Sequence, residues 1–210
     1  MSRPHVLCIT LALAALAAGG WLAGRAAPGP GPAPVPSKTR PTVPTAPTTA
    51  GPGPRLTLDD AIRELNLVRP SPPKVAPDFT VPLAAGPRFR LTEHRGNVVL
   101  VNFWATWCPP CREEMPSMER LWRRHRERGF LLLAVSLDTD TTLVGPFVAK
   151  HGLTFPVALD PGAEVAILYG VRALPVSFVV DPKGNLAVLA LGPRTWDNDA
   201  AHSLVERLAR

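Results

Sequence analysis

The chain has 210 residues, enough for one domain of about 150 residues with its own hydrophobic core and for additional segments. Its formal charge is +6, but most of this charge lies in the first 54 residues. All 17 acidic residues and 19 of the 23 lysines and arginines follow position 54, so the part that can fold has a charge near +2. The charge therefore gives no support to nucleic-acid binding.

The first apolar run, from Val6 to Gly24, carries no charge and is rich in Leu, Ala and Ile. As a helix it would span roughly 28 Å at about 1.5 Å per residue, close to the hydrocarbon thickness of a bilayer. We predict that residues 1–25 anchor the chain in the inner membrane, with the rest on the periplasmic side. A cleaved signal peptide is the alternative, because Gly24-Arg25-Ala26 fits a small-x-small cleavage site. Cys8 is then an apolar residue without a redox role.

Residues 26–54 consist mainly of Pro, Gly, Ala and Thr, with hardly any large apolar side chain. Such a segment cannot bury enough surface to offset the entropy of ordering it, so an extended, solvated linker is expected. In polyproline conformation it would reach up to roughly 90 Å at about 3.1 Å per residue. A stalk between membrane and domain is favoured over a disordered leader without consequence.

Residues 55–74 are expected to form a short helix followed by a spacer. Thr57 is a suitable N-cap, and the acidic residues after it are favoured in the first turn by the helix dipole. The helix should end before Pro70, and Ser71-Pro72-Pro73 should act as the spacer. Its apolar stripe consists of Leu58, Ile62 and Leu65. Docking of this helix on the folded domain is favoured over binding to a partner.

Residues 75–210 read as the folded domain. A small hairpin is predicted from Phe79-Thr80-Val81 and Phe89-Arg90-Leu91. Residues 98–105 are β-branched and nearly uninterrupted in their apolar character, as in a strand buried on both faces, and from Arg112 the apolar residues recur at helical steps.

Further strands and helices alternate to the end of the chain. Strands are predicted at 130–137, 155–158, 176–181 and 186–191, and helices at 143–151, 163–169 and 198–210. The last two strands are joined by a turn at Pro182-Lys183-Gly184-Asn185. This order indicates an α/β fold in which helices flank a central mixed sheet.

Cys108 and Cys111 flank Pro109-Pro110 where the predicted central strand turns into a helix. Two cysteines at this spacing and junction are typical of a redox motif. A closed structural zinc site needs four ligands, and the sequence has no second C-x-x-C or C-x-x-H. A redox pair is therefore favoured over a metal half-site or an inert disulfide, and we expect neither metal nor cofactor.

The sequence NFWATWCPPCREEMP at 102–116 resembles the active site of the thioredoxin fold in its membrane-tethered TlpA/ResA-like branch. The stretch YGVRALPVSFVVD at 169–181 is similar to the one that holds the cis-proline of that fold, and Ala76-Pro77-Asp78-Phe79 resembles the opening of this branch. The resemblance covers about 77–210 and implies a thioredoxin fold with an N-terminal β-hairpin and a strand–helix insert between 136 and 155.

The resemblance implies an extracytoplasmic thiol–disulfide oxidoreductase that reduces specific protein disulfides, such as the cysteine pair of apocytochrome c or the cysteines of a copper site. It also implies a membrane thiol transporter as the electron donor. One rival is a thiol peroxidase, which would place a threonine where this chain has Ala105. Another is a copper- or metal-binding module that uses both thiolates, against which Pro175 and the lack of a third ligand argue.

Thiol–disulfide exchange needs an exposed attacking thiolate and a second thiol that resolves the mixed disulfide. Cys108 stands at the helix start, where the dipole and amide donors lower a thiol pKa, so it is the predicted attacker and the more buried Cys111 the resolving thiol. Pro109 and Pro110 carry no N–H, which removes two donors to the Cys108 thiolate. We therefore expect a reducing potential, nearer the thioredoxin value of about −270 mV than the roughly −120 mV of a strong oxidant.

The resemblance adds a candidate proton acceptor. Glu114 matches the acidic residue that ResA-like proteins place beside their cysteines, and it shares a helical face with Cys111, which it would deprotonate. The alternative is an ordinary surface glutamate near a helix start. Glu113 is expected to point elsewhere and to be solvated. The buried carboxylate of thioredoxin corresponds to Asn102, which cannot accept a proton.

Substrate contacts are predicted at three further residues. Pro175 is expected in the cis form, which would present the backbone of Leu174 to an extended substrate, with a trans loop proline as the alternative. Trp107 is predicted to be an exposed platform for substrate, and Trp104 to belong to the core.

A run of arginines lies on the predicted helix after the cysteines. We expect these side chains to form a solvated face rather than to bind an acidic partner or anionic lipids; they are Arg120, Arg123, Arg124, Arg126 and Arg128.

Overall fold

The computed structural model describes residues 56–210 of the chain. The predicted anchor at 1–25 and the predicted linker at 26–54 lie outside these residues. Within the described part of the chain, no helix has the length and apolar character needed to cross a membrane.

The fold is centred on strand β4 (Val98–Trp104), in which all seven residues are buried. It pairs in parallel with β5 (Phe130–Ser136) and antiparallel with β7 (Val176–Val180). A strand with neighbours on both edges and helices or a hairpin over both faces has no solvent-facing side. This explains the continuous apolar run that predicted it.

The sheet has six strands in the order β1-β8-β7-β4-β5-β6. Its remaining members are β8 (Asn185–Leu191), β6 (Val157–Leu159) and the short edge strand β1 (Lys74–Val75). β4, β5 and β6 are parallel to one another, whereas β7, β8 and β1 pair antiparallel. The predicted mixed sheet is confirmed.

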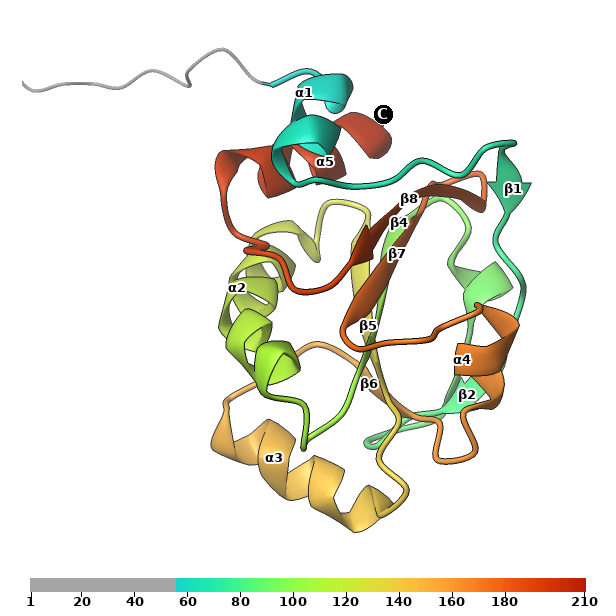
Figure 1. Cartoon of the computed structure of the whole chain (residues 1–210), viewed down its shortest axis with the longest axis vertical. Helices are drawn as coiled ribbons and strands as arrows, with labels where there is room; N and C mark the ends of the chain where they lie inside the picture. The colour runs from blue at the N-terminus through green and yellow to red at the C-terminus, as the bar shows by residue number, and fades with distance from the viewer. Residues whose placement is uncertain (1–55) are drawn as a thin grey trace, which may run out of the picture. The chain divides into compact units, whose positions relative to one another are not determined.

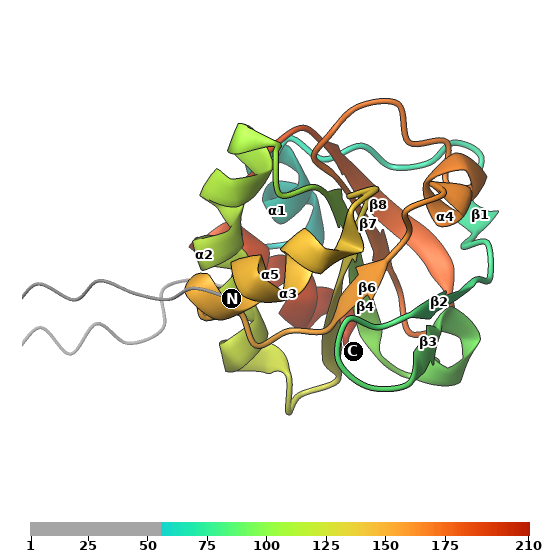
Figure 2. The ribbon, with the colours of Figure 1, turned by 90° about the horizontal axis from the view of Figure 1, so that it is seen from below.

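The two faces of the sheet carry different layers, as Figures 1 and 2 show. Helices cover one face, and α4 with the separate hairpin covers the other. The covering helices are α1 (Leu58–Glu64), α2 (Pro109–His125), α3 (Val144–Lys150) and α5 (Asp199–Leu208). The other layer contains α4 (Glu164–Leu168), β2 (Thr80–Pro82) and β3 (Arg88–Arg90). Two 3-10 turns complete the fold, at Leu91–His94 and Thr141–Leu143. Each element predicted in 75–210 is present, with ends that differ by a few residues.

Helix α1 docks on the domain, as the favoured interpretation predicts. Thr57 caps it through a capping box with Asp60, and the helix packs against α5. The guanidinium of Arg194 donates to the carbonyl oxygens of Leu65 and Asn66, at 2.6 and 2.8 Å, and so fixes the end of the helix.

The residues on either side of the predicted spacer Ser71-Pro72-Pro73 pair with the sheet. Lys74 and Val75 pair with β8, and Val68 forms an isolated bridge with Leu189. A two-residue strand is too short to carry a periodic pattern, which is why the sequence did not reveal it.

Candidate active site

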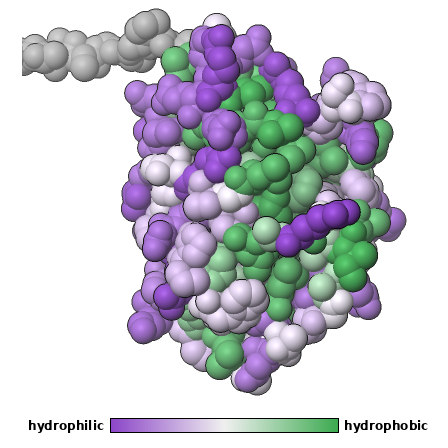
Figure 3. Space-filling model, in the orientation of Figure 1, coloured by the Kyte–Doolittle hydropathy of each residue, from purple (hydrophilic) through white to green (hydrophobic). Residues whose placement is uncertain are grey.

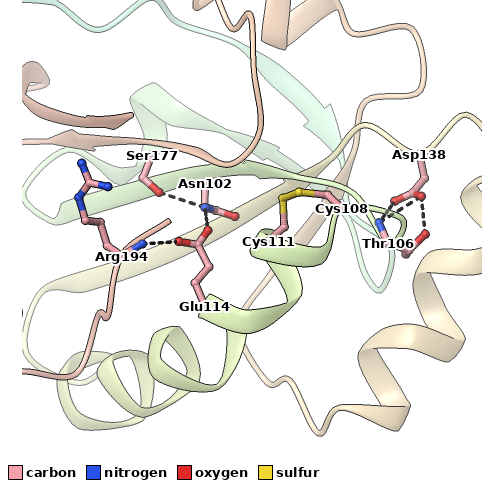
Figure 4. Close-up of a disulfide and its surroundings, with 8 residues drawn as sticks. All are labelled: Asn102, Thr106, Cys108, Cys111, Glu114, Asp138, Ser177 and Arg194. Carbon is pink, nitrogen blue, oxygen red and sulfur yellow. Dashed lines mark hydrogen bonds between the residues drawn. A yellow bond between two sulfur atoms is a disulfide. The ribbon is translucent and has the colours of Figure 1, made fainter. Parts of the chain in front are cut away.

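Cys108 and Cys111 are joined by a disulfide at the start of α2 (Figure 4). Cys108 is the N-cap, and Pro109 and Pro110 occupy the first two helical positions, where a missing N–H breaks no intrahelical bond. Cys111 is fully buried, and Cys108 is 4 % exposed. The more buried position of Cys111 agrees with the prediction, whereas Cys108 is less exposed in this disulfide form than expected of an attacking thiol.

The turn that delivers Cys108 is held from the neighbouring strand. The buried carboxylate of Asp138, just after β5, accepts hydrogen bonds from the backbone N–H of Thr106 at 2.9 Å and from its hydroxyl at 2.6 Å (Figure 4). Asp138 also accepts a bond from the Ser136 hydroxyl at 2.7 Å. Sequence reasoning missed this carboxylate, because nothing local to Asp138 indicates that it meets a turn 32 residues earlier.

An open groove of about 470 Å³ runs along the disulfide. One wall comes from the turn and the start of α2, and the other from the segment before β7. Its lining residues are Trp107, Cys108, Pro109, Pro110, Leu137, Val171, Arg172, Ala173 and Leu174. Cys108 thus borders the groove and Cys111 does not. Figure 3 shows a band of hydrophobic side chains between more hydrophilic margins on the face that contains β7 and β8.

Two of the predicted substrate-contact residues meet in this groove. Trp107 is 66 % exposed, as a platform for substrate requires, and Trp104 is fully buried in the core. Leu174 lines the opposite wall. Its N–H and C=O take part in none of the hydrogen bonds formed among residues 56–210. The backbone of Leu174 is therefore available to an extended ligand.

The peptide bond between Leu174 and Pro175 is cis, which confirms that prediction. The carbonyl oxygen of Pro175 accepts a hydrogen bond from the N–H of Gly192 at 3.0 Å. Gly192 has a φ of +86°, in the left-handed region that glycine adopts without steric cost. The chain leaving β8 thereby supports the loop that lines the groove together with Cys108.

Glu114 is 3 % exposed, so its interpretation as a surface glutamate is wrong, whereas Glu113 is exposed as expected. One carboxylate oxygen of Glu114 accepts a bond from the Asn102 amide at 2.8 Å. The other accepts bonds from the Arg194 N–H at 3.1 Å and the Trp196 indole at 3.2 Å (Figure 4). Burial raises the pKa of Glu114 to about 7 despite these three donors.

Asn102 stands between the carboxylate and the disulfide in Figure 4. Its amide nitrogen also donates to the Ser177 hydroxyl at 3.0 Å, across the pair of strands β4 and β7. Cys111 is not among the hydrogen-bond partners of Glu114. The deprotonation of Cys111 by Glu114 stays a prediction, and within residues 56–210 no direct hydrogen bond joins the two residues in this disulfide form.

The sequence did not predict that residues of the loop before α5 bind Glu114. Trp196 is fully buried, and its backbone N–H donates to the Ser117 hydroxyl at 3.0 Å. A tryptophan inside an otherwise polar loop is the one local signal that could have indicated burial here. The five arginines of α2 and the turn after it are exposed, as the solvated-face interpretation predicts.

Comparisons with known proteins agree with this geometry. The model of the AhpC/TSA family matches residues 72–189. The thiol-disulfide oxidoreductase ResA of Bacillus thuringiensis is 39 % identical over 122 residues, which are 58 % of this chain and 70 % of the relative. ResA of Geobacillus thermodenitrificans is 38 % identical over 127 residues, 60 % of this chain and 73 % of the relative.

Among solved structures, a putative thiol:disulfide interchange protein DsbE from Chlorobium tepidum is similar with a TM-score of 0.62 and 33 % identity. The match covers 69 % of this chain and 99 % of that protein. The similarity thus includes the complete fold of the DsbE protein.

Proposed function

Because the chain belongs to the AhpC/TSA family and is, like its ResA relatives, a thiol–disulfide oxidoreductase, we propose that it reduces specific protein disulfides through Cys108 and Cys111. One observation carries the proposal: the Cys108–Cys111 disulfide borders a groove whose other wall offers the free backbone of Leu174. A protein segment bound there can bring its own disulfide to the sulfur of Cys108.

The groove favours an extended, largely apolar segment. The unpaired N–H and C=O of Leu174 can each bond to a substrate backbone, in the manner of strand addition, without selecting a particular side chain. Trp107 supplies a large aromatic surface opposite, on which a substrate side chain can pack. Selection by shape and backbone suits an enzyme whose target is a cysteine pair in a flexible chain.

The reaction proceeds by two exchanges. The Cys108 thiolate attacks one substrate sulfur, which forms a mixed disulfide and releases the other substrate sulfur as a thiolate that takes up a proton. Cys111 then loses its proton and attacks the sulfur of Cys108, which re-forms the protein disulfide and releases the second substrate thiolate to be protonated. The substrate gains two electrons and two protons, and the protein dithiol loses them.

The position of the reaction in the cell is part of the proposal. The apolar run at Val6–Gly24 favours attachment to the inner membrane, with the enzyme on the periplasmic side. Disulfides persist in such compartments, so a reductase there needs a dedicated donor, for which we propose a membrane thiol transporter. The proposed substrates are the haem-binding cysteines of apocytochrome c or the cysteines of a copper site.

The direction of electron flow rests on Pro109 and Pro110, which remove two amide donors from the Cys108 thiolate. Fewer donors stabilise the reduced form less, which makes the protein the stronger reductant. Equilibration with glutathione measures this property. A potential above about −180 mV would contradict the assignment as a reductase.

The trapping experiment tests the mechanism directly. With Cys111→Ser, the mixed disulfide cannot be resolved, so substrate proteins should stay linked to Cys108 and be identified by mass spectrometry. The matched Cys108→Ser variant should trap nothing. Intact insulin-reduction activity in the Cys111→Ser protein, without any trapped partner, would contradict the two-cysteine mechanism.

A further inference from the structure

Among residues 56–210, the carboxamide oxygen of Asn102 has no hydrogen-bond partner although the residue is fully buried. A buried acceptor without a partner loses its hydrogen bond to water without replacement, so such groups are rare and call for an explanation. In Figure 4 this oxygen is turned toward the disulfide, away from the carboxylate of Glu114. A disulfide sulfur carries no hydrogen and cannot donate to it.

The orientation of this amide follows from its other neighbours. The amide nitrogen of Asn102 faces Glu114 and donates a hydrogen bond to its carboxyl oxygen at 2.8 Å. The same nitrogen gives its second hydrogen to the Ser177 hydroxyl at 3.0 Å. With both N–H groups used on that side, the oxygen is held on the side of the sulfurs.

We infer that Asn102 is a positioning residue for the resolving thiol: its oxygen accepts the hydrogen bond of the Cys111 S–H once the disulfide is reduced. The inference rests on the proposed function, because it assigns the oxygen to the dithiol state of that redox pair. Reduction places one hydrogen on each sulfur, and in Figure 4 the oxygen of Asn102 points toward Cys111. The carboxamide oxygen of Asn102, which has no donor in the disulfide form, thereby gains one in the dithiol form.

This arrangement divides the two cysteines by role. An acceptor next to Cys111 stabilises its protonated thiol, since a hydrogen bond to the neutral form disfavours ionisation. The charge of the reduced pair then falls on Cys108, at the positive end of α2 and beside the groove. The other charged or titratable groups around Asn102 are Glu114, on the same helix as the cysteines, and Arg194, in the loop that binds Glu114.

The equilibrium with a reference dithiol provides the first test. Asn102→Leu removes the acceptor at similar volume, so the dithiol form loses its bond and the disulfide form loses its penalty. The ratio of dithiol to disulfide should fall about tenfold, which corresponds to a potential about 30 mV more negative. Ser177→Ala is the matched control, because it changes the same cluster without touching the oxygen, and it should leave the ratio unchanged.

Infrared spectroscopy provides a readout that a merely structural role would not move. In a protein with Cys8→Ser and Cys108→Ser, Cys111 is the only thiol, and its S–H stretching band should lie at the lower frequency of a hydrogen-bonded thiol. Adding Asn102→Leu should move the band to the frequency of a free thiol. Asn102→Asp keeps an oxygen in place but loses the donor to Glu114, and it should keep the low frequency.

The outcomes separate this inference from the proposed function. A free-thiol band in the protein with Asn102, or a band that Asn102→Leu does not move, overturns the role of Asn102. In either case the Cys111→Ser variant would still trap substrates on Cys108. Failure of that trapping would instead remove the proposed function on which the inference rests.

Discussion

The two sides of the disulfide differ in polarity and in exposure to solvent. The inner side is a closed polar cluster, in which the Glu114 carboxylate and the Asn102 amide are sealed off from solvent by Trp196. The outer side is an open groove lined by the exposed Trp107 and by Leu174. One sulfur pair therefore has a buried side that can hold protons and an accessible side that can hold a substrate.

This contrast indicates that the two sides of the disulfide control different properties of the redox centre. A charge or dipole in the buried cluster acts in a poorly solvated region, so each of its contacts can shift a pKa or the stability of the fold by a large amount. The same group in the groove is surrounded by water, so its contribution is small. Substitutions on the inner side should therefore alter stability and proton affinity, and those on the outer side should alter binding.

Substitution of Trp196, on the inner side, and of Trp107, on the outer side, should give the largest difference in stability. Trp196→Ala removes a fully buried indole and its bond to Glu114, and should lower the free energy of unfolding by about 3–5 kcal/mol. Trp107→Ala removes a side chain that is 66 % exposed, and should change the same quantity by less than about 0.5 kcal/mol while raising KM for a protein disulfide. Urea denaturation of the oxidised proteins measures both. Equal losses in the two variants would contradict the division between the sides.

Glu114 and Glu113 form a second matched pair. Burial raises the pKa of Glu114 from 4.5 to about 7, so between these values the folded protein holds a proton that the unfolded chain has released. Stability should therefore fall as the pH rises through that window, by about 3 kcal/mol in total at about 1.4 kcal/mol for each tenfold change in proton affinity. Glu114→Gln should abolish this fall, whereas Glu113→Gln, at an exposed position, should preserve it.

The measurement is the difference in the free energy of unfolding between each variant and the parent, from about pH 5 to about pH 8. Titration of the buried His125 and the half-buried His202, whose pKa values are lowered by burial, is common to all these proteins and cancels in the difference. A parent protein whose stability does not fall across this window relative to Glu114→Gln would show that the carboxyl is already ionised in the fold.

The groove side and the sheet were predictable from the sequence because their signals are local. The apolar run of β4 predicted a strand buried on both faces, and the C-x-x-C at its end predicted the redox pair. The cis bond before Pro175 was expected because the stretch at 169–181 resembles the one that holds the cis-proline of the thioredoxin fold. Each of these patterns lies within a few residues of the feature that it predicts.

The buried side was not predictable in the same way, because its partners come from distant parts of the chain. Glu114 meets the Arg194 N–H 80 residues later, and Asp138 holds a turn 32 residues earlier. Helical spacing indicated that Glu114 lies near Cys111 but gave no sign that Asn102 stands between the carboxylate and the disulfide. Such contacts depend on how the loop after β8 folds back over α2, which no local period encodes.

A smaller effect is expected from the prolines between the cysteines. Cys108 is the N-cap of α2, and an N-cap side chain accepts from the N–H of the second or third helical residue. Pro110 occupies the second position, so Pro110→Ala restores a donor to the Cys108 thiolate, lowers its pKa and stabilises the dithiol form. The ratio of dithiol to disulfide should rise about tenfold, or about 30 mV, in glutathione equilibration. Pro116→Ala, inside the same helix, is the control and should leave the potential unchanged.

The smallest effect is expected for Arg172, the one charged side chain among residues 56–210 that lines the groove. It is exposed and takes part in none of the ion pairs among residues 56–210, so its charge is available to a substrate. An exposed ion pair contributes about 0.2–1 kcal/mol, so Arg172→Ala should raise KM about 1.4- to 5-fold for a peptide disulfide flanked by acidic residues, with kcat unchanged. Arg124→Ala, an equal loss of charge away from the groove, should not. Because salt screens such a pair, the difference in KM between the two variants should shrink at high ionic strength. A difference that persists at high salt, or that is equally large for a basic peptide, would show that Arg172 acts through packing rather than through its charge.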